Sequence, residues 1–232
     1  MAQLENHTPD KSIIPESAVN RMMDKAALTE EASIKIGDQE GYQIFETTEV
    51  YKGEEINLHI LYNPFSVEQP VFEDFSFVYT VGDDMIAVVV FSKNDGHCYV
   101  SEHRFVDTAR PNTNGLGTIL LQHAEQFFLL LARREKHPLK LQMPLAQAPV
   151  MKWARRNGYK EAPDQEVLVD SIISEYDSGT NSGRFVFRDN QTTINGQAQL
   201  RRGYVFTRSQ TQADIFSAVR IDFEKIIGQR AR

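Results

Sequence analysis

The stretch "VDTARPNTNGLGTILLQHAEQFFLLLARR", Val106 to Arg134, joins two kinds of sequence. Its first half is rich in Gly, Pro, Asn and Thr, which favour turns. Its second half repeats apolar residues at helical spacing, with polar residues between them. Burying each Leu or Phe contributes roughly 1.5–3 kcal/mol, so we expect a long helix held firmly on a sheet. The apolar positions are Leu116, Ile119, Leu120, Ala124, Phe127, Phe128 and Leu131.

The loop before this helix has two interpretations. In Asn112-Thr113-Asn114-Gly115-Leu116-Gly117-Thr118, two glycines stand one residue apart at the helix start. Glycine lets successive N–H groups point inward, and the first N–H groups of a helix have no partner within it. Together with the helix dipole they can bind a diphosphate without a lysine. The alternative is a tight strand-to-helix turn that uses glycine for its geometry alone.

Two common nucleotide motifs are excluded at this loop. The dinucleotide fingerprint needs a third glycine where Leu120 stands, and a P-loop needs Gly-Lys-Ser/Thr, which does not follow.

The segments around the loop predict an α/β (α+β) domain. From Tyr42 to Val106 the pattern is β, with turns at Lys52-Gly53-Glu54-Glu55, Gly82-Asp83-Asp84 and "KNDG". The run "MIAVVVF" is apolar at both parities, which predicts a central strand buried on both faces. After the helix come a short strand, "LKLQM", and a second helix, "APVMKWARR", capped at Asn157-Gly158. A strand–helix–strand unit of this length predicts a right-handed parallel crossover.

We expect extensions on both sides of this domain, which spans residues 39–165. Residues 1–38 form an N-terminal extension with one helix, from about Pro15 to Ala32. Residues 166–232 form a C-terminal extension that packs on the main sheet or on a second subunit, because two short strands bury too little alone. There "EVLVDSIISEY", "RFVFR" and "GYVFTR" predict strands, and the segment from Asp214 to Ile227 predicts a helix.

Composition sets limits on the class of protein. The chain has 232 residues, 41% of them hydrophobic, and a net charge of -7. This charge argues against non-specific binding of nucleic acid, which needs a basic face. The single cysteine, Cys98, allows no intrachain disulfide, and we find no signal-peptide core or bilayer-length apolar run. We therefore expect a cytoplasmic protein that does not enter membranes.

Two motifs in this order resemble the GNAT superfamily of acyl-CoA N-acyltransferases. The family's loop pattern, Arg/Gln-x-x-Gly-x-Gly/Ala, is matched by Asn112-x-x-Gly115-x-Gly117. Its second helix, Asn-x-x-Ala-x-x-Phe-Tyr-x-x-x-Gly-Phe, is matched by Gln147-x-x-Val150-x-x-Trp153-Ala154-Arg155-Arg156-Asn157-Gly158-Tyr159. The resemblance covers about residues 42–165. Asn112 departs from the usual Arg or Gln, and Ala154 replaces a Tyr that often protonates the leaving thiolate.

The resemblance implies a GNAT-like central mixed β-sheet flanked by helices, with acetyl-CoA as cosubstrate. Acetyl-CoA would insert between the strands "HCYVSEHRFV" and "LKLQM", and a backbone N–H near Val106 would polarise the thioester carbonyl. The expected cofactor-binding residues are Val106, Arg110, Asn112, Thr113, Asn114, Gly115, Leu116, Gly117 and Thr118. Arg110 would add positive charge beside Asn112.

Catalysis would require a base for the attacking amine. A lysine-type amine titrates near 10.4, so presenting it neutral at pH 7 costs about 4–5 kcal/mol. The candidate catalytic residues are Glu102 and His103; as strand neighbours they should face opposite sides of the sheet, so at most one faces the cleft. The histidines lack ligand-like spacing, and we expect no metal site.

The resemblance leaves three functions open. The first is an acyl-CoA-dependent N-acyltransferase that moves acetyl from acetyl-CoA to an amine acceptor, a small molecule or a protein, by direct attack on the thioester. The second is a GNAT-fold protein without catalysis that serves as a structural or partner-binding module, for example in a phage particle; Ala154 and the extensions favour it. The third is a regulatory CoA sensor. A homodimer is compatible with each.

Overall fold

The computed structural model describes residues 13–24, 28, 33–64, 73–145, 148–161, 165–177, 188–194, 197–203 and 221–228. The chain divides into two compact units, which we describe separately. The first contains residues 1–139 together with 226–232, and the second contains residues 140–225.

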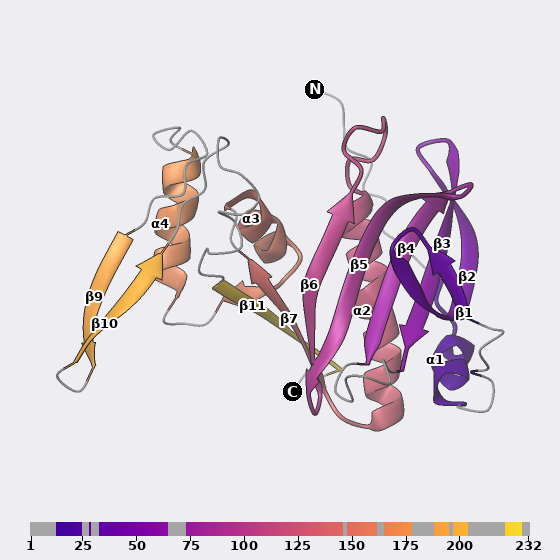
Figure 1. The fold of residues 1–232 in the computed structure, drawn as a ribbon, viewed down its shortest axis with the longest axis horizontal. Coiled ribbons are helices and arrows are strands. Elements are labelled where there is room, and N and C mark those ends of the chain that lie inside the picture. Colours follow the sequence, from indigo (N-terminus) through magenta and orange to yellow (C-terminus); the bar gives the residue numbers. More distant parts are fainter. Residues whose placement is uncertain are drawn as a thin grey trace. The chain divides into compact units, whose positions relative to one another are not determined.

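An antiparallel sheet forms the body of the first unit (Figure 1). Each strand pairs with the next along the chain, because tight turns connect most of them. Turns lie at the three predicted places, each with a glycine of positive φ, but they are residues 52–53, 82–83 and 96–97. The other residues that the sequence assigned to these turns belong to the ends of β3 and β5. The strands are β1 (Ser33–Ile36), β2 (Gln39–Tyr51), β3 (Glu54–Asn63), β4 (Asp74–Val81), β5 (Asp84–Asp95) and β6 (Cys98–Val106).

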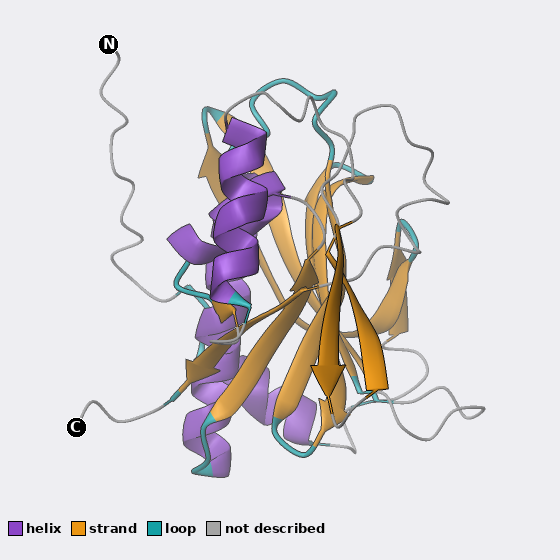
Figure 2. Ribbon diagram, turned by 90° about the vertical axis from the view of Figure 1, so that its left-hand side faces the viewer, coloured by secondary structure: helices purple, strands orange, loops and turns teal. Residues whose placement is uncertain are grey.

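Two helices pack on one face of this sheet. The long helix α2 (Leu116–Glu135) contacts β4, β5 and β6, and the short helix α1 (Glu16–Met23) contacts β2 and α2. The sequence predicted the first helix from Pro15 to Ala32, but it ends at Met23 and Asp24 is no longer helical. Its buried stripe is only Ala18, Val19 and Met22, so little apolar area supports a longer helix. Figure 2 shows the helices and strands from the side.

An aromatic cluster joins α2 to the sheet. Phe128 lies with its ring centroid 4.7 Å from that of Tyr99, 5.2 Å from Phe91 and 5.6 Å from Phe75. Phe127 packs on Phe75 and Phe77, and all of these side chains are fully buried. The predicted apolar stripe is therefore confirmed, with Ile119 alone only half-buried. As predicted, the centre of β5 is buried on both faces, because its odd-numbered and even-numbered side chains are both covered.

The second unit contains short strands and two helices. Its elements are β7 (Leu139–Leu145), α3 (Ala148–Arg156), β8 (Lys160–Glu161), α4 (Glu166–Asp177), β9 (Arg188–Ile194), β10 (Gln197–Gly203) and β11 (Ile221–Ile227), with one or two end residues of β7 and β11 in the first unit. The predicted strand "LKLQM", the helix "APVMKWARR" and the left-handed Gly158 are confirmed. Strand β11 pairs antiparallel with β8, and β9 pairs with β10 as a separate hairpin.

Two predictions in the C-terminal region are wrong. The segment "EVLVDSIISEY" is the helix α4, not a strand. Packing on α3 and the ion pair between Arg155 and Asp170 favour the helix over the β-propensity of its Val and Ile residues. Residues 221–227, predicted as the end of a helix, are strand β11. There Ile221 and Phe223 are buried and Asp222 between them is exposed, which is the period of a strand.

Parts of three other expected elements lie outside the described residues. They are most of "RFVFR", all but Gly203 of "GYVFTR", and residues 214–220 of the expected final helix. The α+β class and the GNAT-like order of strand, glycine loop, long helix, strand and helix are confirmed. The division into an N-terminal extension, a central domain and a C-terminal extension stays a prediction.

Removing one ring of the aromatic cluster should strongly destabilise the protein. We expect Phe128→Ala to lower the free energy of unfolding by about 3–5 kcal/mol, because it leaves a cavity among five packed rings. Phe105→Ala is the matched control, since Phe105 is among the exposed large apolar residues. Urea unfolding of both variants measures the difference. Equal losses would show that the cluster is not what holds α2 on the sheet.

Candidate functional site

The glycine loop begins where β6 ends, and its own polar groups fold it. The N–H of Asp107 donates to the carbonyl of Ile86 at 2.9 Å, which continues the pairing of β5 and β6 by one residue. The Asp107 carboxylate then accepts from the N–H of Ala109 at 3.0 Å. The buried Thr113 hydroxyl donates to the carbonyl of Arg110 at 3.1 Å. Asp and Thr therefore stabilise turns here in the way their short side chains allow.

Two residues of the loop adopt left-handed backbone. Asn112 has φ of 67°, and Gly115, the N-cap of α2, has φ of 97°. Asn tolerates this region better than most side chains, which gives a physical reason for Asn at a position where the GNAT pattern has Arg or Gln. Alternation between right-handed and left-handed backbone conformations turns the N–H groups of neighbouring residues toward a common side, as in anion-binding nests.

The hydrogen bonds of the loop leave several donors unused. The N–H of Leu116 donates to the carbonyl of Thr113 at 3.1 Å, and the N–H of Thr118 donates to the carbonyl of Gly115 at 3.0 Å. Within the described part of the chain, no backbone carbonyl accepts from five other N–H groups of the loop. They belong to Asn112, Thr113, Asn114, Gly115 and Gly117. Seven of the nine predicted cofactor-binding residues, Asn112 to Thr118, thus divide into five whose N–H groups have no backbone acceptor among the described residues and two, Leu116 and Thr118, whose N–H groups are committed.

A side chain would be disfavoured at Gly115 and at Gly117 for different steric reasons. A Cβ atom on Gly115 would lie 2.8 Å from the hydroxyl oxygen of Tyr51, and its positive φ would strain any other residue. A Cβ atom on Gly117 would lie 3.3 Å from Cγ2 of Val106. Val106, the last residue of β6, pairs with Ala87 of β5, so Gly117 lets α2 start close to the sheet.

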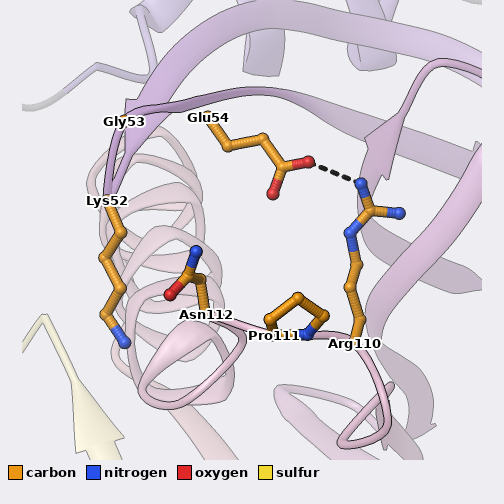
Figure 3. A pocket seen from close by; sticks show the side chains of 6 residues that line it. All are labelled: Lys52, Gly53, Glu54, Arg110, Pro111 and Asn112. Atoms are coloured by element: carbon orange, nitrogen blue, oxygen red, sulfur yellow. Dashed lines mark hydrogen bonds and ion pairs between the residues drawn. The ribbon is translucent and has the colours of Figure 1, made fainter.

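The hairpin between β2 and β3 holds the loop at two points. The Tyr51 hydroxyl and Nζ of Lys52, the latter at 2.9 Å, both donate to the carbonyl oxygen of Asn114. Arg110 Nη2 lies 2.5 Å from Oε1 of Glu54. Figure 3 shows Glu54 and Arg110 pointing toward each other across the pocket. Arg110 is thus beside the loop as predicted, but its charge is already paired.

A pocket of about 600 Å³ lies between this hairpin and the loop. Its lining combines two cations with one carboxylate and the exposed amide of Asn112. The residues are Lys52, Gly53, Glu54, Arg110, Pro111 and Asn112 (Figure 3).

Sequence reasoning missed the contribution of the hairpin. It identified Lys52-Gly53 as a turn and assigned no role to Tyr51 or Lys52. These residues lie 63 and 62 positions before Asn114, so no local pattern connects them to the loop. The order of the strands brings them together.

The two candidate catalytic residues lie at an irregularity of β6. His103 pairs with Val90 and Val100 pairs with Ser92, so four residues of β6 stand opposite three of β5. This is a β-bulge at Ser101-Glu102, and a bulge interrupts the strict alternation of faces on which the sequence argument relied. The side chains of Glu102 and His103 lie outside the described residues, so their roles stay predictions.

A second polar cluster is buried beneath α2. The Tyr79 hydroxyl donates to Glu49 Oε1 at 3.3 Å, and Nε2 of the buried His123 lies 3.3 Å from the same oxygen without hydrogen-bond geometry. Burial, followed by the charge of Glu49, raises the pKa of Tyr79 above its usual range. The phenol therefore stays protonated and can donate to the carboxylate. Glu49 and Tyr51 are two apart on β2 and share a face, so this face contacts both α2 and the loop.

In the second unit, Ala154 and Arg155 serve the packing of α3. Ala154 is fully buried, and its carbonyl accepts from the N–H groups of Asn157 and Tyr159, closing the helix. Arg155 pairs with Glu161 and with Asp170. The hydrogen bond with Glu161 is the main cause that raises the pKa of Arg155. The guanidinium of Arg155 is thus engaged within its own unit.

The described residues contain no group of three or more His, Cys, Asp or Glu side chains that could hold a metal ion. No helix among them is long and apolar enough to cross a bilayer.

Comparison with known proteins gives partial likenesses in structure. No protein-family model and no curated protein matches the sequence. A tandem GNAT protein of clavulanic acid biosynthesis aligns with a TM-score of 0.33 and 17% identity over 40% of this chain, and the chain spans only 30% of that protein. The ribosomal-protein-S18-alanine N-acetyltransferase of Escherichia coli aligns with a TM-score of 0.37 and 15% sequence identity. The alignment covers 71% of this chain and 74% of that enzyme.

A GNAT family acetyltransferase from Elizabethkingia anophelis, solved with acetyl-CoA bound, gives a TM-score of 0.33 and 11% identity. It covers 71% of this chain and 96% of its own. At these values we base no functional inference on the likenesses.

Gly115 should be costly to replace. Gly115→Ala strains a left-handed residue, which costs of order 1–3 kcal/mol, and its Cβ displaces Tyr51 from Asn114. Gly96→Ala is the matched control, because Gly96 is also left-handed (φ 44°) and none of the described residues has an atom within 4 Å of the added Cβ. We expect urea unfolding to show a larger loss for Gly115→Ala by about 1 kcal/mol, the value of one hydrogen bond. Equal losses of unfolding free energy in the two variants would mean that the contact between Tyr51 and Asn114 does not contribute to stability.

Proposed function

We propose that the protein binds CoA thioesters through the glycine loop, with the pyrophosphate on the N–H groups of residues 112–115 and Gly117. The observation that carries this proposal is the set of five N–H groups, at the start of a 20-residue helix, that have no backbone acceptor in the part of the chain that the structure describes. A helix start concentrates unpaired donors and the positive end of the helix dipole, which favours a phosphate group. The pocket beside the loop is lined by Lys52 and Arg110, whose cationic groups are engaged with the carbonyl of Asn114 and with Glu54.

The reaction we propose is acetyl transfer from acetyl-CoA to an amine. The amine nitrogen attacks the thioester carbonyl carbon and forms the C–N bond. The C–S bond then breaks, the sulfur leaves with the bonding pair, and the proton lost by the amine ends on the thiol. The chain must supply a base for the amine and donors for the carbonyl oxygen.

The bulge in β6 supports a role for this strand. A bulge frees backbone groups from the ladder and redirects side chains, which is why bulges are frequent beside active sites. Glu102 lies at the bulge, and we assign it the role of general base, acting through water, with His103 as the alternative. Val106 ends the same strand, and we keep its N–H as the candidate donor to the thioester carbonyl.

A second candidate function is CoA binding without catalysis, as a sensor or a partner-binding module. The observation that favours it is Ala154, which is buried and has no hydroxyl where the GNAT pattern often has Tyr. The two functions share the loop and differ in whether a free thiol is released.

Calorimetry with CoA tests the binding step. We expect the wild-type chain to bind CoA and Gly115→Val to lose detectable binding, because the side chain forces the loop out of its left-handed geometry. Gly96→Val, in the turn between β5 and β6, should bind as the wild type does. Absence of binding by the wild type at millimolar CoA would refute the proposed site.

Thiol release over a panel of amines tests the catalytic step. We expect Glu102→Gln to lower kcat by roughly 10²-fold, because general-base assistance contributes about that much. His103→Gln is the matched variant one residue along the strand and should change kcat less. Unchanged rates across pH would assign Glu102 a structural role, and no thiol release with any amine would favour the second function.

A further inference from the structure

Of the two points at which the hairpin between β2 and β3 holds the glycine loop, one is the peptide group between Asn114 and Gly115. Two donors from the hairpin, the Tyr51 hydroxyl and Lys52 Nζ, converge on the carbonyl oxygen of Asn114. They also contact one another, since Nζ lies 5.1 Å from the centre of the Tyr51 ring. A cation at that distance from an aromatic face is attracted to it, which restricts the two side chains together.

The geometry of this peptide gives the contact a consequence at the loop. The carbonyl of Asn114 and the N–H of Gly115 belong to the same planar unit, and in a trans peptide they point in opposite directions. Donors that fix the carbonyl toward the hairpin therefore fix the N–H of Gly115 away from it. Hydrogen bonds to a carbonyl also polarise the N–H of its peptide, which strengthens that N–H as a donor.

We propose that Tyr51 and Lys52 are positioning residues that orient the Gly115 N–H for a phosphate group of the ligand. The inference rests on the proposed function, because it concerns how the same loop binds the pyrophosphate. It assigns a role in binding to a hairpin that the sequence marked only as a turn. Neither residue touches the reacting atoms.

The backbone of the loop makes such support necessary. Gly115 has no Cβ and adopts φ of 97°, so its peptide could rotate at little cost if nothing held it. Its N-cap position has no side-chain cap hydrogen bond. The ion pair between Arg110 and Glu54 fixes the other end of the loop to the same hairpin, so residues 110–114 are supported at both ends.

Binding of CoA and of inorganic pyrophosphate to Tyr51→Phe and Lys52→Met tests the proposal. We expect each variant to bind both ligands about five-fold or more weakly, the effect of losing one hydrogen bond of about 1 kcal/mol. Tyr42→Phe on β2 and the exposed Lys35→Met on β1 are the matched controls and should bind as the wild type does. Both lie near the far end of β2 from the hairpin.

The amide resonance of Gly115 in ¹⁵N-labelled protein provides a readout of orientation. Loss of a donor to the Asn114 carbonyl should move this resonance in both variants before ligand is added, and the shift induced by pyrophosphate should shrink. If the variants turn over acetyl-CoA, KM should rise while kcat stays within two-fold of the wild type, because the reacting groups are untouched. Should Tyr51→Phe fail to fold, the measurements on Lys52→Met test the proposal alone. Lys52 is exposed at a turn, so its replacement should leave the fold intact.

The outcomes separate this inference from the proposed function. Wild-type protein that does not bind CoA overturns the proposed function and this inference with it. Wild-type binding with equal affinity in both variants, or an unmoved Gly115 resonance, overturns the role of the hairpin and leaves the proposed function standing. Equally weakened binding in the two control variants would also overturn it.

Discussion

The packing of helix α2 across β4, β5 and β6 is the constraint on which the rest of the first unit depends. Phe127 and Phe128 are adjacent on the helix, and their rings contact aromatic side chains from β4, β5 and β6. Interdigitated rings allow few alternative registers, because a shift of one residue would open cavities. The aromatic cluster therefore fixes where the helix begins, and through this it fixes where the glycine loop must end.

Polar contacts then set the orientation of the loop. On one face of β2, Glu49 lies beside His123 of the helix and Tyr51 reaches Asn114 of the loop. The apolar cluster supplies most of the free energy that holds the helix, since each buried ring contributes more than a hydrogen bond does. The hydrogen bonds are directional, and they select one conformation of a backbone that glycine leaves permissive. A loop of this kind can keep several N–H groups without backbone acceptors because its other groups are fixed.

Much of the fold could be predicted from local patterns. The apolar spacing of α2, the turns between the strands and the left-handed Gly158 follow from periodicity and from the conformational preferences of Gly and Asn. The two wrong assignments have a different cause. In residues 166–177 the Val and Ile residues favour a strand, but Val169 is buried in a helix whose Asp170 and Asp177 pair with Arg155 and Lys152 of α3. In residues 221–227, the sequence alternates apolar and polar residues only from Ile221 to Glu224, which is too short a run to distinguish a strand from the end of a helix.

The sequence by itself determined the glycine loop and its helix, because Gly115 permits the left-handed start and the apolar spacing that follows specifies the buried face. It left two interpretations of the loop open, a site for a diphosphate and a tight turn. Only the tertiary structure decided which N–H groups remain without backbone acceptors, that Arg110 is paired with Glu54, and that Tyr51 and Lys52 reach Asn114. The physical reason is that these contacts join residues more than fifty positions apart. Such pairs are set by strand order and register, which depend on the packing of the whole sheet.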